Sequence, residues 1–153
     1  MIKIKKSPTA DTRTCDVSLV DKQTLLNSSC QHIQDVGMAL AFFGSKLMEA
    51  AVKHDYDKLT EIDWFLSDFK TKFEQTGWWD NHRKIHRHHL NKEDGIPADV
   101  NLIDLIEYIS DCVMAGMARS GSIYEIEASD ELLRKAFNNT VELLKNQIEV
   151  KND

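Results

Sequence analysis

Apolar residues recur every three or four positions along most of the chain, which is the period of an amphipathic helix. Asp21 or Thr24 can cap a first helix, which we expect to end near Gly44. Its apolar positions are Leu25, Leu26, Ile33, Val36, Leu40 and Phe43. Ser45 then begins a shorter helix that runs to His54. The first third of the chain is therefore predicted to form two successive helices.

The same periodicity predicts four further helices. Thr60 begins one that breaks at Gly77, and the histidine-rich residues 78–89 form the next. The most apolar helix spans residues 102–117, and Ser129 caps the last one. The apolar face of the helix after Thr60 is Ile62, Phe65, Leu66, Phe69 and Phe73, and that of the last helix is Leu132, Leu133, Ala136, Phe137, Val141, Leu144 and Ile148.

The two ends of the chain carry weaker signals. Ile2 and Ile4 alternate with lysines, which predicts a brief strand. Residues 7–14 are polar and rich in turn-forming types, so they predict a surface arm. The alternative is a flap that places Arg13 on a phosphate. Residues 150–153 are expected to fray.

The pattern as a whole predicts an all-α protein. Residues 91–101 form a loop, because Asp94-Gly95 and Pro97 are turn signals. Beyond the brief strand there is no β pattern and no internal repeat. We therefore expect a single compact domain of five or six helices over residues 21–150, preceded by a short irregular N-terminal arm of residues 1–20.

Length, charge and cysteine content narrow the class. A chain of 153 residues suffices for one domain, and its formal net charge of −6 argues against general nucleic-acid binding. Three cysteines without a CxxC spacing fit a reducing compartment. No apolar run approaches the roughly 18 residues of a membrane span, and the N-terminus lacks a signal-peptide core. We expect a soluble cytoplasmic protein.

Candidate chemistry is concentrated in the histidines. Four of the six lie within residues 82–89, and histidine is the commonest metal ligand. On a helix, His82, His86 and His89 would share one face, with His88 close to it. The alternative is a basic, solvated helix face, because Arg83, Lys84 and Arg87 lie among them.

Isolated polar residues in apolar helices add to this cluster. His32 lies among the apolar positions of the first helix, and Asp111 lies in the most apolar helix with Glu107 and Asp104 on its face. Such groups need a partner when buried. Together with His54-Asp55 they suggest a metal site. Imidazole and carboxylate ligands suit Zn, Mn, Fe, Co or Ni, and Mg where carboxylates and water dominate.

The order of these residues resembles the HD-domain metal-dependent phosphohydrolases, which have an H…HD…D signature on an all-α scaffold. The matching residues are His32, His54-Asp55 and Asp111, and Lys58 completes a form similar to HDxxK. Residues 88–97 resemble the HH…DG…P stretch of the HD-GYP subgroup. Ser28 stands where trinuclear members have a glutamate, which argues against a third metal. The alternative is that the chain resembles the small HD-like proteins of unassigned function that phages encode.

The resemblance implies a metal centre. One divalent ion would be held by His32, His54, Asp55 and Asp111. Asp55 could bridge to a second ion, whose other ligands would be His82, His88 and His89. Lys58, with Arg83 or Arg87, would neutralise phosphate charge. His86 would lie behind the ligands or at the surface. If only the first ion binds, the histidines of the second set would contact phosphate or donate protons.

Three interpretations stay open at this point. The first is hydrolysis of a phosphate ester, above all of a nucleotide, with Asp55 and Lys58 as catalytic residues. The second is a catalytically inactive HD-like module that binds a structural metal. The third is a helical interaction protein with incidental histidines, which predicts that His32, His54 and Asp111 lie far apart. An oligomer is compatible with each of them.

Overall fold

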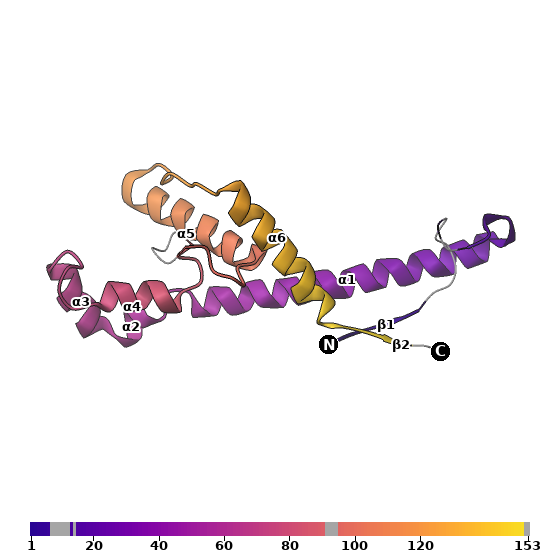
Figure 1. The fold of residues 1–153 in the computed structure, drawn as a ribbon, viewed down its shortest axis with the longest axis horizontal. Helices are drawn as coiled ribbons and strands as arrows, with labels where there is room; N and C mark the ends of the chain where they lie inside the picture. Colours follow the sequence, from indigo (N-terminus) through magenta and orange to yellow (C-terminus); the bar gives the residue numbers. More distant parts are fainter. Residues whose placement is uncertain (7–12, 14, 91–94, 152–153) are drawn as a thin grey trace. The chain divides into compact units, whose positions relative to one another are not determined.

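The computed structural model describes residues 1–6, 13, 15–90 and 95–151, and over these residues the chain is all-α in character (Figure 1). This confirms the predicted fold class. The helices are α1 (Lys22–Lys53), α2 (Asp57–Thr60), α3 (Ile62–Lys70), α4 (Trp78–Ile85), α5 (Leu102–Ser120) and α6 (Asp130–Lys145), with a short 3-10 helix at Val17–Leu19. Two strands, β1 (Ile2–Lys5) and β2 (Ile148–Lys151), complete the described elements. No helix among them is both long and apolar enough to cross a membrane.

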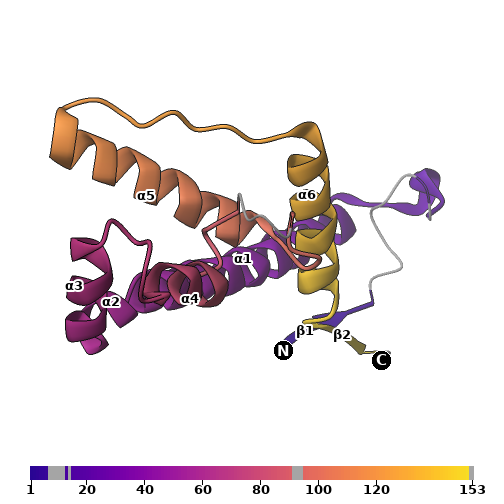
Figure 2. The same ribbon diagram turned by 60° about the vertical axis from the view of Figure 1, so that its left-hand side comes forward.

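The chain divides into two units by its internal contacts. The first comprises residues 1–45 and 142–153, and the second residues 46–141. In the first unit β1 and β2 pair in parallel, with Ile2 opposite Ile148, and lie side by side in Figures 1 and 2. The predicted N-terminal strand is thus confirmed. The tail was expected to fray from Val150, but this is wrong for Val150 and Lys151, because β2 hydrogen-bonds to β1. Residues 152–153 of the tail and residues 7–12 and 14 of the arm lie outside the described residues.

α1 is a single helix of 32 residues. Asp21 caps it by accepting a hydrogen bond from the Thr24 amide at 2.7 Å. The predicted break near Gly44 is wrong, because the helix continues to Lys53. Gly44 is itself part of the helix. A glycine inside a helix lowers the stability of the helix but does not by itself end it. The helix stops instead before Asp55, whose φ of 51° is left-handed.

The helix that was expected to run from Thr60 to Gly77 is shorter at both ends. Thr60 ends α2, and α3 ends at Lys70 rather than at Gly77. The chain leaves the helical path because Lys72 and Phe73 have φ values of 58° and 66°. The aromatic side chains of α3 still pack against the chain that follows, and the ring of Phe65 lies 4.2 Å from the ring of Trp78, the first residue of α4.

The buried carboxylate of Asp68 fixes the turn between α3 and α4. It accepts hydrogen bonds from the amides of Thr76 at 2.8 Å and Trp79 at 2.9 Å, so it caps the start of α4 from a distance in sequence. Trp78, fully buried, then packs on Phe65 and stacks on His82 at 4.7 Å. This turn therefore sets where the first histidine of the cluster lies.

α4 ends at Ile85, so the predicted histidine helix through His89 is wrong. His86 has extended backbone angles, and the chain then runs without helix to Leu90. Tertiary contacts outweigh the helical pattern here. Arg87 forms a bidentate ion pair with Asp104 at 2.7 and 2.8 Å, and Leu90 is buried in the core.

α5 and α6 carry that core. Asn101 and Asp104 form a capping box at the start of α5, and Ser129 caps α6 as predicted, by accepting a hydrogen bond from the Leu132 amide at 3.1 Å. The Thr140 hydroxyl joins the helices by accepting from the Leu102 amide at 2.8 Å. The buried core comprises Leu90, Val100, Leu105, Leu132 and Ala136.

Asp68→Asn should lower the melting temperature at pH 7, and the loss should shrink as the pH falls. Burial, the largest influence, raises the pKa of Asp68, but the hydrogen bonds from Trp79 and Thr76 together outweigh it and leave that pKa below its usual value. A depressed folded-state pKa gives stability that is present above the unfolded-state value of about 3.9 and lost as the pH falls below it. Thermal unfolding of both proteins between pH 7 and pH 3 measures this.

The control is Asp63→Asn, an exposed carboxylate on the same helix. Its melting temperature should stay much closer to wild type. A difference between wild type and Asp68→Asn that is constant down to pH 3 would contradict the assignment.

Candidate metal centre

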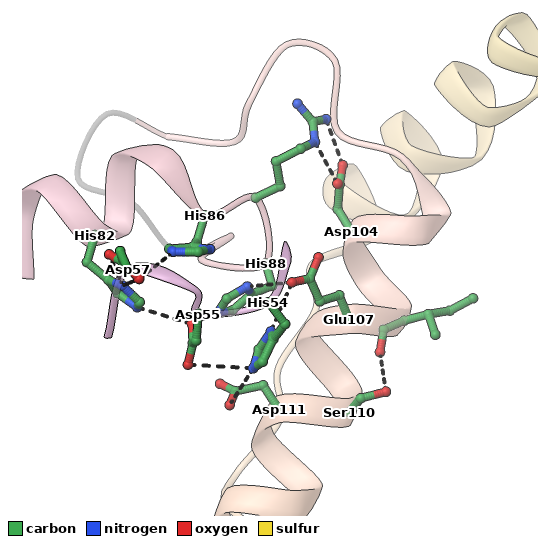
Figure 3. A network of polar contacts seen from close by, with 12 residues as sticks. His54, Asp55, Asp57, His82, His86, His88, Asp104, Glu107, Ser110 and Asp111 are labelled. Carbon is green, nitrogen blue, oxygen red and sulfur yellow. Dashed lines mark hydrogen bonds and ion pairs between the residues drawn. The ribbon is translucent and has the colours of Figure 1, made fainter. Parts of the chain in front are cut away.

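Asp55 is at the middle of the site, in the turn between α1 and α2. Its left-handed φ of 51° costs about 1 kcal/mol for a residue with a side chain, although aspartate tolerates it better than most. Strained backbone of this kind is often found at functional sites. The turn directs the carboxylate toward the histidines of α4 and of the segment after it, as Figure 3 shows.

Two buried imidazoles face one oxygen of Asp55. His82 Nε2 lies 3.4 Å and His88 Nε2 lies 3.5 Å from Asp55 Oδ1, beyond ordinary hydrogen-bond geometry. Their side chains are 0% and 1% exposed. His89 belongs to the same group, whose ligand atoms all lie within 4.8 Å of one another. Among the described residues no hydrogen-bond partner exists for Asp55 Oδ1 or for the Nε2 atoms of His82, His88 and His89.

Two carboxylates behind the imidazoles fix their orientation. Glu107 Oε1 lies 2.9 Å from His54 Nδ1 and 3.0 Å from His88 Nδ1, and Asp57 Oδ2 lies 2.8 Å from His82 Nδ1 (Figure 3). Each Nδ1 that donates to a carboxylate leaves the opposite Nε2 with its lone pair. Carboxylate–histidine pairs of this kind are the usual support of a histidine metal ligand.

The other oxygen of Asp55 belongs to a second group on the exposed side. His54 Nε2 lies 3.6 Å from Asp55 Oδ2 and 3.7 Å from Asp111 Oδ1. The side chains of His54 and Asp111 are 31% and 32% exposed. The two oxygens of Asp55 thus face two different sets of candidate ligands, one buried and one open to solvent.

The charge state of these groups suits a cation. Burial, followed by the neighbouring His88 and His82, lowers the pKa of His89 to about 3, and burial also lowers the pKa of His82. Burial raises the pKa of Asp55, but Lys58, through its hydrogen bond and charge, and the nearby histidines outweigh it and hold that pKa below the usual range. Neutral imidazoles and ionised carboxylates are the forms that coordinate metals.

The residues present fit a divalent metal ion. Four donors of a tetrahedral zinc site with bonds of about 2.0–2.1 Å lie about 3.4 Å apart, and the distances from Asp55 Oδ1 to His82 and His88 match this spacing. Buried polar atoms without partners are rare. Two other groups, His54-His88-Glu107 and Asp57-His82-His86, are already joined by hydrogen bonds of 2.7 to 3.0 Å. They support the ligands instead.

Most of the predicted ligands therefore come together. His54, Asp55 and Asp111 form one group, and Asp55, His82, His88 and His89 form another. The proximity of His54 and Asp111 disagrees with the interpretation that the histidines are incidental and these two residues lie far apart. His32 is exposed on the part of α1 in the first unit, and it belongs to neither group.

The predicted cations have different surroundings. Lys58 donates a hydrogen bond to Asp55 Oδ2 and is 31% exposed. Arg83 pairs with Asp80 and lies over the Trp79 ring at 5.9 Å. Arg87, which was expected to contact substrate, has both edges of its guanidinium engaged by Asp104 and Asp99. Arg13 is exposed in the first unit.

The sequence interpretation missed the supporting carboxylates. Asp57 is 1% exposed and binds both His82 and His86, which places His86 behind the ligands. A signal was present for Glu107, because it precedes Asp111 by one helical turn and so shares its face of α5. Asp57 had no such signal, since its role depends on how α2 packs against α4.

The chain was compared with protein-family models, with curated proteins and with solved structures, and none of them matches it. The case for the site consequently rests on its geometry.

Glu107→Gln should weaken the binding of Zn²⁺ and Mn²⁺ about 10- to 100-fold, because the amide is a weaker acceptor for two imidazole N–H groups. Competition with a chromophoric chelator measures this change. Glu127→Gln, at an exposed position in the same unit, is the matched control and should bind metal as wild type does. Equal affinity in all three proteins would show that Glu107 does not support ligands.

Proposed function

We propose that this protein is a divalent-metal-dependent hydrolase of phosphate esters, with a nucleotide or a related compound as substrate. The observation that carries the proposal is the position of Asp55. Its two oxygens face two ligand sets, and the second set provides only three protein groups, of which His54 and Asp111 are about one-third exposed. Hydrolytic metal sites keep a position open, whereas structural sites are closed.

The chain's residues divide into ligands and supports. Asp55, His82, His88 and His89 would hold one ion, and His54, Asp55 and Asp111 would contribute to a second. Bound divalent ions activate water and neutralise phosphate charge. Glu107 and Asp57 hold the imidazoles in position, so that ligand geometry is set before an ion arrives.

Lys58 is the cation best placed for a phosphate oxygen. It reaches Asp55 Oδ2 from the partly exposed side, next to His54 and Asp111. Arg83 is a weaker candidate, because its partner Asp80 belongs to neither ligand group. A phosphate ester would thus meet cationic groups on the open side of the site and imidazoles on the buried side.

The resemblance to the HD-domain phosphohydrolases supports the same activity. In that family the H…HD…D residues gather at a metal centre, and three of the four matching residues, His54, Asp55 and Asp111, form one group in this protein. The likeness to the HH motif is also supported, because His88 and His89 join Asp55 and His82. The fourth matching residue, His32, has no comparable support.

A structural metal site is the second candidate function. The group of Asp55, His82, His88 and His89 already has four ligands and is largely buried, as in sites where the protein fills every position. In that case the ion would stabilise the second unit, and the exposed His54-Asp55-Asp111 group would have no chemical role.

The variant Asp55→Asn tests whether the protein has a metal site at all, which both candidate functions require. Asparagine keeps the size of the side chain and tolerates the left-handed backbone, but it loses the shared negative charge. Wild type, purified without a metal-binding tag, should contain about one or two equivalents of a divalent ion, and the variant should lose them. With Mn²⁺, Ni²⁺ or Co²⁺ added, wild type should hydrolyse nitrophenyl phosphates or nucleotides, and the variant should be at least about 100-fold slower.

Asp63→Asn is the control for both measurements. Metal in wild type without hydrolysis of any tested ester would favour the structural site. No metal in wild type after reconstitution would overturn both candidate functions.

Lys58→Met tests the role of the lysine separately from metal binding. Its metal content should equal that of wild type, while kcat should fall about 100-fold because the phosphate loses a cation. The exposed Lys70→Met is the matched control. Unchanged kcat with full metal content would remove Lys58 from the proposed catalytic residues.

A further inference from the structure

The first unit has no buried residue among those that the structure describes. It consists of β1, β2, the 3-10 helix, residues 22–45 of α1 and the last turn of α6. A two-stranded sheet is marginal on its own, and a long helix in water gains most of its stability from packing an apolar face. The unit therefore needs apolar contacts that it does not make internally.

The apolar face of α1 is exposed. We define the α1 seam as Leu26, Ser29, Ile33, Val36, Leu40 and Phe43, which follow one another at alternating intervals of three and four residues. Of these, Leu26, Ile33, Val36 and Leu40 are 52%, 68%, 42% and 65% exposed. Large apolar side chains in a continuous stripe mark an interaction surface, whereas scattered ones do not.

The opposite face of α1 is the one that the first unit uses. Ser28, Gln31 and Asp35 are half-buried, unlike the seam residues from Leu26 to Leu40, and Gln31 donates a hydrogen bond to the Lys5 carbonyl of β1 at 2.9 Å. The polar side of this helix is thus turned toward its own strand, and the apolar side is turned outward. This inverts the usual arrangement of a surface helix.

The spacing of the seam identifies the partner as another helix. Intervals of three and four residues average 3.5, the repeat that keeps two supercoiled helices in continuous contact. Val36 and Phe43 then occupy d positions, and Ile33 and Leu40 occupy a positions. A strand or a flat surface imposes no such repeat.

Two glycines beside the seam point to a close approach. Gly37 and Gly44 lie one heptad apart within α1, and a Cβ added at either would meet no described atom of the chain within 4 Å. Glycine in a helix interior costs up to about 1 kcal/mol relative to alanine. Nothing in the described chain requires these glycines, whereas a second backbone crossing there would.

The charge pattern favours an identical partner. Of the 24 residues from 22 to 45, only Lys22 and Asp35 carry a formal charge, and Asp35 lies on the opposite face. The positions that flank the seam and usually select a different partner by charge are, within residues 26–45, Cys30, His32, Gly37, Ala39 and Gly44, none of which carries a formal charge with histidine neutral. Two copies can therefore meet along this face without like-charge repulsion. We infer that α1 forms a coiled-coil interface with α1 of a second copy of this chain.

The test is the mass of the full-length protein in solution, measured by light scattering and sedimentation equilibrium. Wild type should have twice the monomer mass of 17.5 kDa at micromolar concentration. Ile33→Glu combined with Leu40→Glu should raise the dissociation constant at least about 100-fold, because two buried anchors become charged. Gln34→Glu combined with Ala41→Glu adds the same charges on adjacent, exposed residues outside the seam and should remain dimeric.

A second seam variant guards against a folding defect. Ile33→Ala combined with Leu40→Ala raises helix propensity and removes only apolar surface, so it should fold and still dissociate. A monomeric wild type would overturn the inference, and so would a dimer that persists in this alanine variant with unchanged affinity. Both outcomes are measured on the purified protein alone.

Discussion

One carboxylate, that of Glu107, joins the parts of the candidate metal centre. It receives His54 from the turn after α1 at 2.9 Å and His88 from the extended segment after α4 at 3.0 Å, and it projects from α5 beside Asp111 (Figure 3). Three stretches of chain that are distant in sequence thus meet at a single acceptor, whose side chain is 13% exposed. Without this acceptor, the buried imidazole of His88 would have an unpaired N–H group, which costs about 1–3 kcal/mol.

The contacts around Glu107 explain why the surrounding elements depart from regular structure. The left-handed Asp55 ends α1 and turns His54 toward α5, and the extended backbone at His86 allows His88 to reach it. Arg87, between these histidines, is fixed on Asp104 one helical turn before Glu107. Local backbone cost is therefore offset by charge-assisted hydrogen bonds, each stronger than a neutral one.

The two units differ in how their apolar residues are used. In the second unit, Leu90, Val100 and Leu132 are packed in a core that supports α5 and α6 behind the metal site. In the first unit, the equivalent residues of α1 are exposed. This division separates the candidate metal centre from the proposed association of two copies, since the groups that could hold a metal ion all belong to the second unit and the α1 seam belongs to the first.

The sequence by itself determined the helical class, the strand at Ile2–Lys5, the cap at Ser129 and the residue types of the candidate metal centre. Periodicity and capping are local properties, so they can be read without a structure. It could not determine that α1 continues past Gly44 or that α4 stops at Ile85. Those boundaries depend on Asp55, on the Arg87–Asp104 pair and on the burial of Leu90, which involve residues far apart in the chain.

Tertiary structure alone decided which polar residues form groups that could hold a metal ion and which hold those residues in position. His86 has the same side chain as His82 and His88, but its Nε2 is bonded to Asp57 at 2.7 Å, whereas theirs face Asp55. The guanidinium of Arg87 is paired with Asp104, and Asp57, for which the sequence carried no signal, is bonded to two histidines. The physical reason is that a side chain's role depends on its hydrogen-bond partners, and these are brought together only by the fold.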